Sequence, residues 1–149
     1  MDREPSSVAV GGRKPALPAA TVARVVGSVL RAERRAADVS VTFLGPVAMR
    51  RLNARHLGHD RVTDVISFAM TGPDGRLVGE IAVCRAAAAA EARRRGIRLR
   101  EELIRLLIHG TLHLLGYDHP ESGDRTASPM WRRQERYVRR LTRTAGVRQ

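Results

Sequence analysis

Three histidines between positions 109 and 119 have the spacing of ligands to one metal ion. His109 and His113 are four residues apart, so on an α-helix they lie about one turn apart with both side chains on the same face. Two imidazoles placed in this way can each reach one metal ion at about 2.0–2.1 Å. Gly116 can adopt the left-handed conformation that ends a helix, and the chain can then turn and bring His119 back over the same face.

This ligand set is typical of a catalytic zinc site. Such a site has three protein ligands and an open fourth position, whereas a structural zinc site is closed by four protein ligands. The sequence therefore predicts one zinc ion as cofactor, held by His109, His113 and His119. The alternative of ordinary surface or core histidines suits a lone His-x-x-x-His pair better than a set with a third histidine and a glycine at the turn. Three imidazoles also suit nickel, cobalt and copper, and affinity order alone does not select zinc.

The residue after the first histidine separates this motif from that of the zinc proteases. The spacing matches their long motif H-E-x-x-H-x-x-G-x-x-H, whose Glu serves as general base, but Gly110 stands at that position here. The missing carboxylate argues against peptide hydrolysis by the usual route. The sequence identifies no catalytic acid or base of its own. Asp118 has two interpretations, a partner that orients a ligand imidazole or a simple turn residue, and the second is slightly favoured.

The helix that carries these histidines is expected to lie in the middle of the fold. Apolar residues cover most of the circumference of segment 99–115, which is typical of a buried helix. Its narrow polar stripe consists of Glu102, Arg105, His109 and His113. The metal pair is therefore predicted to lie on the only solvent-accessible line of this helix, as a preorganised site requires.

Hydrophobic periodicity divides the rest of the chain into helices and strands. Apolar residues at helical spacing predict further helices over residues 21–35, 46–56, 86–95 and 130–144. Apolar runs and alternation predict strands over residues 38–44, 65–69 and 77–84, and the Gly-Pro-Asp-Gly turn between the last two indicates a hairpin. Residues 1–17 are predicted to be a flexible N-terminal segment, in which residues 8–10 are a candidate short edge strand.

The composition fits one domain with a polyanionic partner. The 149 residues suffice for one hydrophobic core, so residues 1–149 are expected to form a single domain. The net charge of +12 favours RNA or DNA over a membrane as partner. A high-GC genome would explain why Arg outnumbers Lys, but not why basic residues outnumber acidic ones. Aromatic residues make up only 3%, so base stacking is not expected to dominate nucleic-acid binding.

The cysteine content and the hydropathy pattern predict a cytoplasmic protein. Cys84 is the single cysteine, so no intrachain disulfide can form and a reducing compartment fits. The chain has no apolar run of about 18 residues for a membrane span, and its N-terminus lacks the apolar centre of a signal peptide.

The C-terminal segment is strongly basic. Either it tracks RNA phosphates or it is a solvated helix face, and the sequence weights these two interpretations about equally. The arginines concerned are Arg132, Arg133, Arg136, Arg139, Arg140, Arg143 and Arg148.

Taken together, these motifs resemble the YbeY-type endoribonucleases, the bacterial rRNA maturation factor family. Residues 109–119 match that family's H-G-x-L-H-L-x-G-Y-D-H signature without a departure. The likeness runs from about residue 39 to residue 138. It includes a second family motif and a counterpart of the family's Gly-Asp-Ile, which fall here on Leu52, Asn53, Asp60, residues 63–68 and residues 79–81.

The resemblance implies a zinc-dependent, single-strand-specific endoribonuclease that acts in 16S rRNA 3′-end maturation and ribosome quality control. It implies rRNA and the small ribosomal subunit as partners, and it carries over His109, His113 and His119 as the zinc ligands. It also implies an α+β fold, with a small mixed sheet of about four strands, about five flanking helices and a buried central helix that carries the metal ligands.

The chain departs from the family pattern at three positions. Leu57 stands where the family usually has an Arg that faces the metal cleft, and Arg55 and Arg61 are candidate substitutes. Phosphoryl transfer needs charge stabilisation beside the metal, so this departure bears on catalytic efficiency. Val62 replaces a usual Pro and Trp131 a frequent Glu, and both are interpreted as packing changes.

Two other classes of function compete with the ribonuclease. In the first, the chain is a non-catalytic ribosome-assembly factor whose zinc is structural and whose basic surface binds rRNA, and Leu57 favours this alternative somewhat. In the second, the chain is a zinc hydrolase of another substrate class, such as a peptidase, and Gly110 weighs against it. The motif, the charge and the resemblance together favour the ribonuclease.

Overall fold

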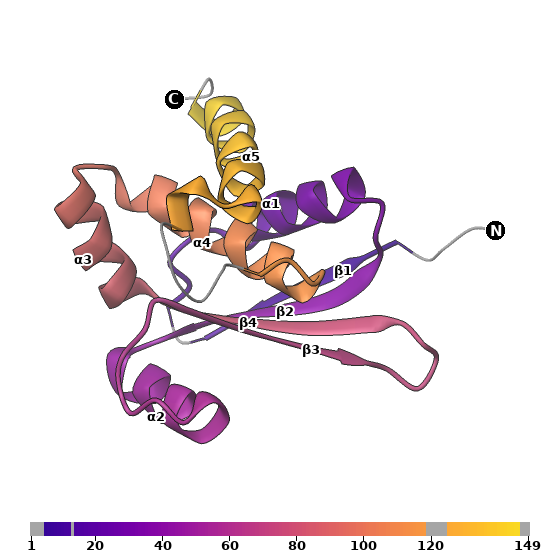
Figure 1. The fold of residues 1–149 in the computed structure, drawn as a ribbon, viewed down its shortest axis with the longest axis horizontal. Helices are drawn as coiled ribbons and strands as arrows, with labels where there is room; N and C mark the ends of the chain where they lie inside the picture. Colours follow the sequence, from indigo (N-terminus) through magenta and orange to yellow (C-terminus); the bar gives the residue numbers. More distant parts are fainter. Residues whose placement is uncertain (1–4, 13, 119–124, 147–149) are drawn as a thin grey trace.

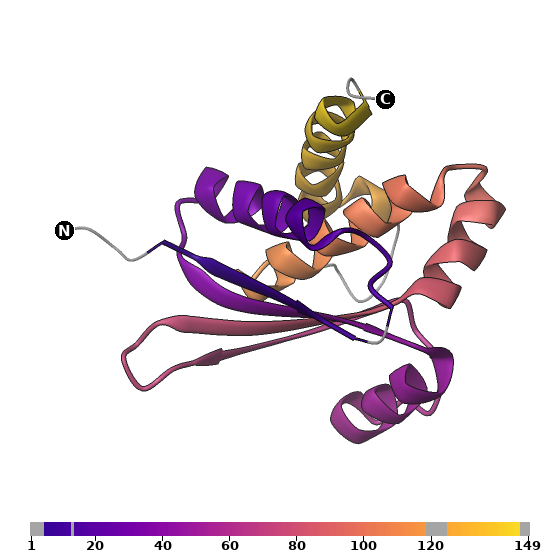
Figure 2. The ribbon, with the colours of Figure 1, turned by 180° about the vertical axis from the view of Figure 1, so that it is seen from behind.

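The computed structural model describes residues 5–12, 14–118 and 125–146 (Figures 1 and 2). Within these ranges the chain forms a four-stranded sheet and five α-helices, which confirms the predicted α+β class. The elements are β1 (Ser7–Gly11), α1 (Ala19–Ala32), β2 (Ala37–Leu44), α2 (Pro46–Leu57), β3 (Val65–Thr71), β4 (Leu77–Cys84), α3 (Arg85–Arg95), α4 (Leu99–Leu114), a 3₁₀ turn (Arg125–Ala127) and α5 (Pro129–Gly146).

The predicted elements differ from the observed ones mainly at their ends. Helix α1 stops at Ala32, before the predicted residue 35, and Arg34 adopts a positive φ of 58° that a helix cannot continue through. The candidate strand at residues 8–10 is part of β1, which pairs with β2. Among the helices of the described residues, none combines the length and the apolar composition that crossing a bilayer requires.

The sheet is mixed, with the strand order β1-β2-β4-β3. Strands β1, β2 and β4 run parallel, and β3 joins β4 as the antiparallel partner in the predicted hairpin. The hairpin turn closes through backbone hydrogen bonds from Gly72 N–H to the Arg76 carbonyl and from Gly75 N–H to the Gly72 carbonyl. This order makes β1 and β3 the two edges of the sheet.

Strand alternation gives the sheet two faces of different character. Val39, Val41 and Phe43 of β2 point into the main core beneath α1 and α4. On the opposite face, Met49 of α2 packs into a smaller cluster with Cys84, which is fully buried as a small core residue. Figures 1 and 2 both show α2 on one side of the sheet and α1 with α4 on the other.

The C-terminal end of α4 has the predicted glycine turn. Gly116 adopts a φ of +99°, and its N–H donates to the His113 carbonyl at 3.0 Å. The N–H of Tyr117 reaches back to the Leu112 carbonyl at 3.1 Å. These two bonds form a Schellman motif, which satisfies the last carbonyls of the helix and turns the chain away from its axis. The turn comes directly after the two histidines of α4.

Helix α4 approaches the sheet so closely that a Cβ atom at either of two glycines would force a neighbouring side chain to shift. A Cβ atom at Gly110 would lie 2.9 Å from Cγ2 of Ile81, and one at Gly79 would lie 2.5 Å from Cδ1 of Leu114. Both distances are shorter than carbon atoms normally tolerate. Gly110 therefore faces the core, and the reason for its glycine is packing against β4.

Adding a methyl group at residue 110 tests this contact. Gly110→Ala gains up to about 1 kcal/mol of helix propensity, but overpacking against Ile81 costs about 1–3 kcal/mol. We expect a net loss of about 1 kcal/mol in the free energy of unfolding, measured by urea denaturation. In an Ile81→Ala background the clash disappears, so the same Gly110→Ala change should stabilise the protein. Equal effects of Gly110→Ala in both backgrounds would contradict this account.

Candidate metal centre

The two helical histidines lie side by side near the end of α4. The ring centroids of His109 and His113 are 4.5 Å apart, with the rings at 74° to each other, and both side chains are half-buried. This matches the predicted placement on one face, one turn apart. His119, the third predicted ligand, lies outside the described residues, which contain no group of three or more His, Cys, Asp or Glu side chains close enough to hold a metal. The three-histidine site therefore stays a prediction.

A buried glutamine fixes the orientation of His109. Gln134 of α5 is 1% exposed, and its Oε1 lies 2.7 Å from the His109 Nδ1 atom. The Nε2 group of the same amide donates to Glu135 at 3.1 Å, so its Oε1 is the acceptor and the His109 Nδ1 carries the proton. With Nδ1 so engaged, His109 would bind a metal through Nε2, which is the usual division of labour at zinc-bound histidines.

The buried Arg105 holds Glu135, the acceptor of the Gln134 amide group, in place. Arg105 of α4 donates to both carboxylate oxygens of Glu135 at 2.9 Å, to Glu102 at 3.0 Å and to Glu101 at 3.1 Å. Arg95 of α3 reaches the same Glu102 at 3.3 Å. Bidentate pairing of this kind fixes geometry as well as charge. The network connects α3, α4 and α5 around one guanidinium group.

The network corrects the prediction of a solvent-accessible polar stripe. Glu102 and Arg105 are 3% and 6% exposed, so this half of the stripe is buried and only the histidine half is accessible. Burial raises the pKa of Glu102, and hydrogen bonds from Arg105 only partly oppose that shift. Burial also raises the pKa of Glu135, but its bonds from Arg105 and Gln134 outweigh burial and hold that pKa below its usual range.

The partner of His113 is a carboxylate, whereas that of His109 is an amide. The Nδ1 atom of His113 lies 3.2 Å from Oδ1 of Asp118, whose side chain is 84% exposed. The sequence slightly favoured a simple turn residue at this position, whereas the structure places the carboxylate where it orients the imidazole. The reason is the Schellman turn at Gly116, which folds Asp118 back toward the end of the helix.

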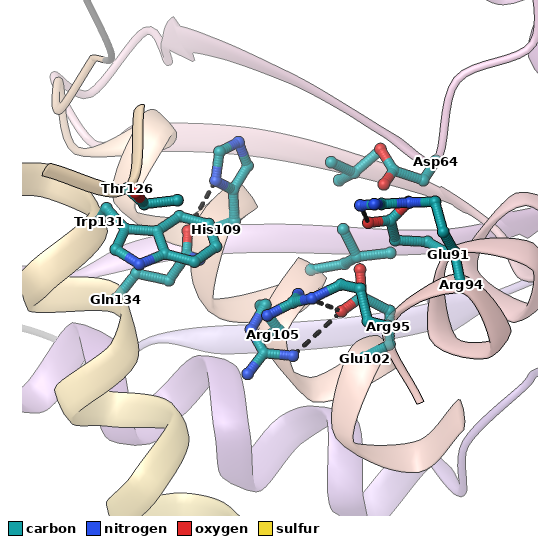
Figure 3. A pocket seen from close by; sticks show the side chains of 12 residues that line it. Asp64, Glu91, Arg94, Arg95, Glu102, Arg105, His109, Thr126, Trp131 and Gln134 are labelled. Atoms are coloured by element: carbon teal, nitrogen blue, oxygen red, sulfur yellow. Dashed lines mark hydrogen bonds and ion pairs between the residues drawn. The ribbon is translucent and has the colours of Figure 1, made fainter. Parts of the chain in front are cut away.

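A cavity of about 530 Å³ opens beside His109 (Figure 3). Five elements or their flanking residues line it, because α3 and the start of β3 face α4, the 3₁₀ turn and the start of α5 across it. The described residues that line it are Asp64, Val65, Glu91, Arg94, Arg95, Glu102, Arg105, Leu106, His109, Thr126, Trp131 and Gln134. The sequence did not indicate that these residues share one cavity, because no local pattern shows that five separate segments meet.

The charged side chains of the cavity differ in their partners, and one of them lies beside an aromatic ring. Arg94 is paired with Glu91, and the Arg95 guanidinium lies over the Trp131 ring at 5.9 Å from its centroid. Burial raises the pKa of Asp64, and bonds to backbone N–H groups oppose that shift only in part. None of the described lining residues is Leu57, Arg55 or Arg61. The arginines beside His109 thus come from α3 and α4, not from the loop after α2.

Removing the buried guanidinium tests the network. Arg105→Met leaves Glu102 and Glu135 buried without their main partner, and we expect a loss of about 3–5 kcal/mol in unfolding free energy at pH 7.5. Without Arg105 the folded-state pKa values of these carboxyls rise above the unfolded value of about 4.3. The folded variant then binds more protons than the unfolded chain, so its deficit should shrink as the pH falls toward 5.

Denaturation of wild type and of Arg105→Met with guanidinium chloride, at pH 7.5 and at pH 5, measures this difference in unfolding free energy. Arg50→Met is the matched control, because it removes an exposed partner of Asp60 and should leave stability nearly unchanged. A deficit that does not depend on pH would contradict the proposed role of the two carboxylates.

Comparison with known proteins gives a consistent result. The family model described as Endoribonuclease YbeY matches residues 14–142. A protein named Endoribonuclease YbeY from Geobacter sulfurreducens is 41% identical over 115 residues, covering 74% of this chain and 76% of its own. Its namesake from Chlorobium phaeobacteroides is 38% identical over 130 residues, with 86% and 91% coverage. The solution structure of TM1509 from Thermotoga maritima superposes with a TM-score of 0.65 at 28% identity, covering 90% of this chain and 88% of that one.

Proposed function

The chain belongs to the endoribonuclease YbeY family, and we propose that it is a zinc-dependent endonuclease of single-stranded RNA that acts in 16S rRNA 3′-end maturation and ribosome quality control. The observation that carries the proposal is the histidine pair of α4, in which His109 and His113 each have Nδ1 against a side-chain oxygen. We further propose that the protein works in the cytoplasm, with rRNA and the small ribosomal subunit as its partners.

The donor set fits zinc. Two imidazoles lie adjacent on one helix face, each with Nδ1 against a side-chain oxygen, so Nε2 of each ring would be the atom that binds a metal. His119 follows a turn that redirects the chain. Nitrogen ligands of this type, with an oxygen acceptor behind each ring, are the usual environment of zinc. Bound there, zinc would lower the pKa of a water molecule toward 7 and polarise a phosphoryl oxygen.

The chain's own residues supply orientation and charge. Gln134 and Asp118 hold the two rings, so little reorganisation is needed when a ligand arrives. Arg94 and Arg95 line the cavity beside His109 and bring positive charge to the position where a flanking phosphate would lie. These two arginines take the part for which the sequence offered Arg55 or Arg61.

The outer surface of α5 suits the phosphates of a longer RNA. Arg132, Arg136 and Arg139 are exposed on this helix. Arg133 and Arg140 instead lie over the rings of Tyr117 and Tyr137, and Arg133 also pairs with Glu33. The basic helix is therefore partly structural and partly open to solvent. Exposure fits both interpretations that the sequence left open, and the proposed RNA substrate is what favours phosphate tracking by its exposed arginines.

The structure adds a physical argument against the peptidase alternative. The position of the protease general base is Gly110, whose missing side chain would point at Ile81 in the core. A glutamate there would displace a core residue of β4 and would not face the histidines. The assembly-factor alternative is favoured by one observation, namely that Leu57 is 51% exposed where the family usually has an Arg.

RNA cleavage by wild type and by His113→Ala decides between these functions. The substrate is a short single-stranded RNA with a 16S 3′-end sequence, incubated with and without a chelator. We expect cleavage by wild type only, with a loss of at least about 100-fold on chelation or on His113→Ala, because either change removes the metal. His59→Ala is the matched control and should cut normally, because it alters an exposed histidine that is not among the described residues lining the cavity beside His109.

Metal analysis of the same samples completes the test. Wild type should hold one zinc per chain and His113→Ala markedly less. If wild type holds zinc and binds the RNA without cutting it, the assembly-factor function replaces the nuclease. Equal cleavage by every sample would mean that the histidine pair is not the catalytic centre.

A further inference from the structure

The cavity beside His109 carries side chains that the metal chemistry does not require. Trp131 is the single tryptophan of the chain and lines this cavity. Asp64 and Glu91 lie on the other side of the cavity from Trp131, with His109 between the two sides (Figure 3). An aromatic wall facing a carboxylate, next to a metal pair, is a combination that suits an unstacked base of single-stranded RNA.

We propose that this cavity is a subsite for one nucleobase of the RNA substrate, in which Trp131 stacks on the base and Asp64 accepts hydrogen bonds from its edge, with guanine as the preferred base. We call it the base subsite and define it by Asp64, Arg95, Trp131 and the adjacent His109. The inference rests on the proposed RNA substrate and deepens it, because it names the base that lies beside the scissile phosphate.

The aromatic wall has the right surroundings for stacking. The Arg95 guanidinium carbon lies 5.9 Å from the Trp131 ring centroid, close to the outer limit of about 6 Å for a cation–π contact. The two planar groups therefore lie near each other without tight packing. Single-stranded RNA bases stack on aromatic rings and on arginine planes alike, and the cavity volume of about 530 Å³ accommodates a purine.

The carboxylate has acceptor capacity to spare. The Asp64 carboxylate accepts hydrogen bonds from its own N–H and from that of Val65, and within the described part of the chain no side-chain donor contacts it. An ionised carboxylate has about four acceptor sites, so about two remain. The other two acids of the cavity differ, because Glu91 is paired with Arg94 and Glu102 with Arg105.

These acceptor sites select a base by the number of donors on its edge. Guanine presents N1–H and N2–H side by side, which match the two oxygens of one carboxylate in a bidentate arrangement. Adenine and cytosine offer one amino group each, and uracil flanks its single N–H with carbonyl oxygens that repel a carboxylate. The Asp64 carboxylate would also repel a phosphate, so Asp64 itself suits a base edge, whereas a flanking phosphate would lie at Arg94 and Arg95.

Tryptophan fluorescence provides a direct assay, because Trp131 is the only emitter of its kind in the chain. The chelated full-length protein is titrated with the pentanucleotide UUGUU and with versions that carry inosine, adenosine, cytidine or uridine at the central position. We expect quenching with a preference of about tenfold for guanosine over inosine, which lacks the N2 amino group and so one hydrogen bond to a charged acceptor. Equal affinities across the series would overturn the proposal without any variant being needed.

Variants assign the effect to the two side chains. Asp64→Asn should abolish the preference for guanosine over inosine, whereas Asp74→Asn, a matched change in the β3–β4 turn, should keep it. Trp131→Ala should weaken binding of labelled UUGUU about tenfold by anisotropy, and Trp131→Phe should restore most of the affinity. Thermal melts confirm that each variant is folded. An Asp64→Asn protein that cuts slowly yet keeps the preference for guanosine would make Asp64 a catalytic residue and reject the base subsite.

Parallel cleavage assays separate this proposal from the nuclease function. If wild type cuts RNA but binds all five oligonucleotides equally, the base subsite is wrong and the nuclease proposal stands. If guanosine is preferred but nothing is cut, the base subsite stands and the nuclease proposal is wrong.

Discussion

The buried guanidinium of Arg105 is the interaction on which the site depends. It donates hydrogen bonds to Glu101 and Glu102 of α4 and to Glu135 of α5. The buried carboxylates among these would be unstable without it. By fixing Glu135 it fixes the amide of Gln134, and the amide in turn fixes the protonated nitrogen of His109. An ion-pair network centred one helical turn before His109 thus sets the protonation of that ring.

The position of α4 on the sheet is the second constraint. Contacts at Gly79 and Gly110 allow the helix to lie directly on β4, so the face with the histidines turns away from the core toward α5 and the cavity. The glycine that excludes a protease base is therefore the same residue that seats the helix. Close packing of α4 on β4 favours a residue without a side chain at position 110, and the same glycine leaves the position of the protease base empty.

The sequence predicted the elements well because they are determined by local patterns. The periodicity of residues 99–115 sufficed for a buried helix, and Gly116 sufficed for its end. The sequence could not predict that Glu102 and Arg105 are buried, because Arg105 pairs with Glu135 of α5 and Glu102 pairs with Arg95 of α3, and these helices become neighbours only after folding. The same holds for Gln134 and for the cavity between Asp64 and Trp131, whereas the place of His119 in the site stays a prediction.

The protonation of the His109 ring in the metal-free protein is the measurement that tests this account most directly. Nitrogen-15 NMR of the histidine side chains at pH 7.5 distinguishes a proton on Nδ1 from one on Nε2. We predict that His109 carries its proton on Nδ1, and that a Gln134→Leu variant loses this preference while it stays folded. A wild-type ring with its proton on Nε2 would contradict the account, because the nitrogen assigned to the metal would then be the wrong one.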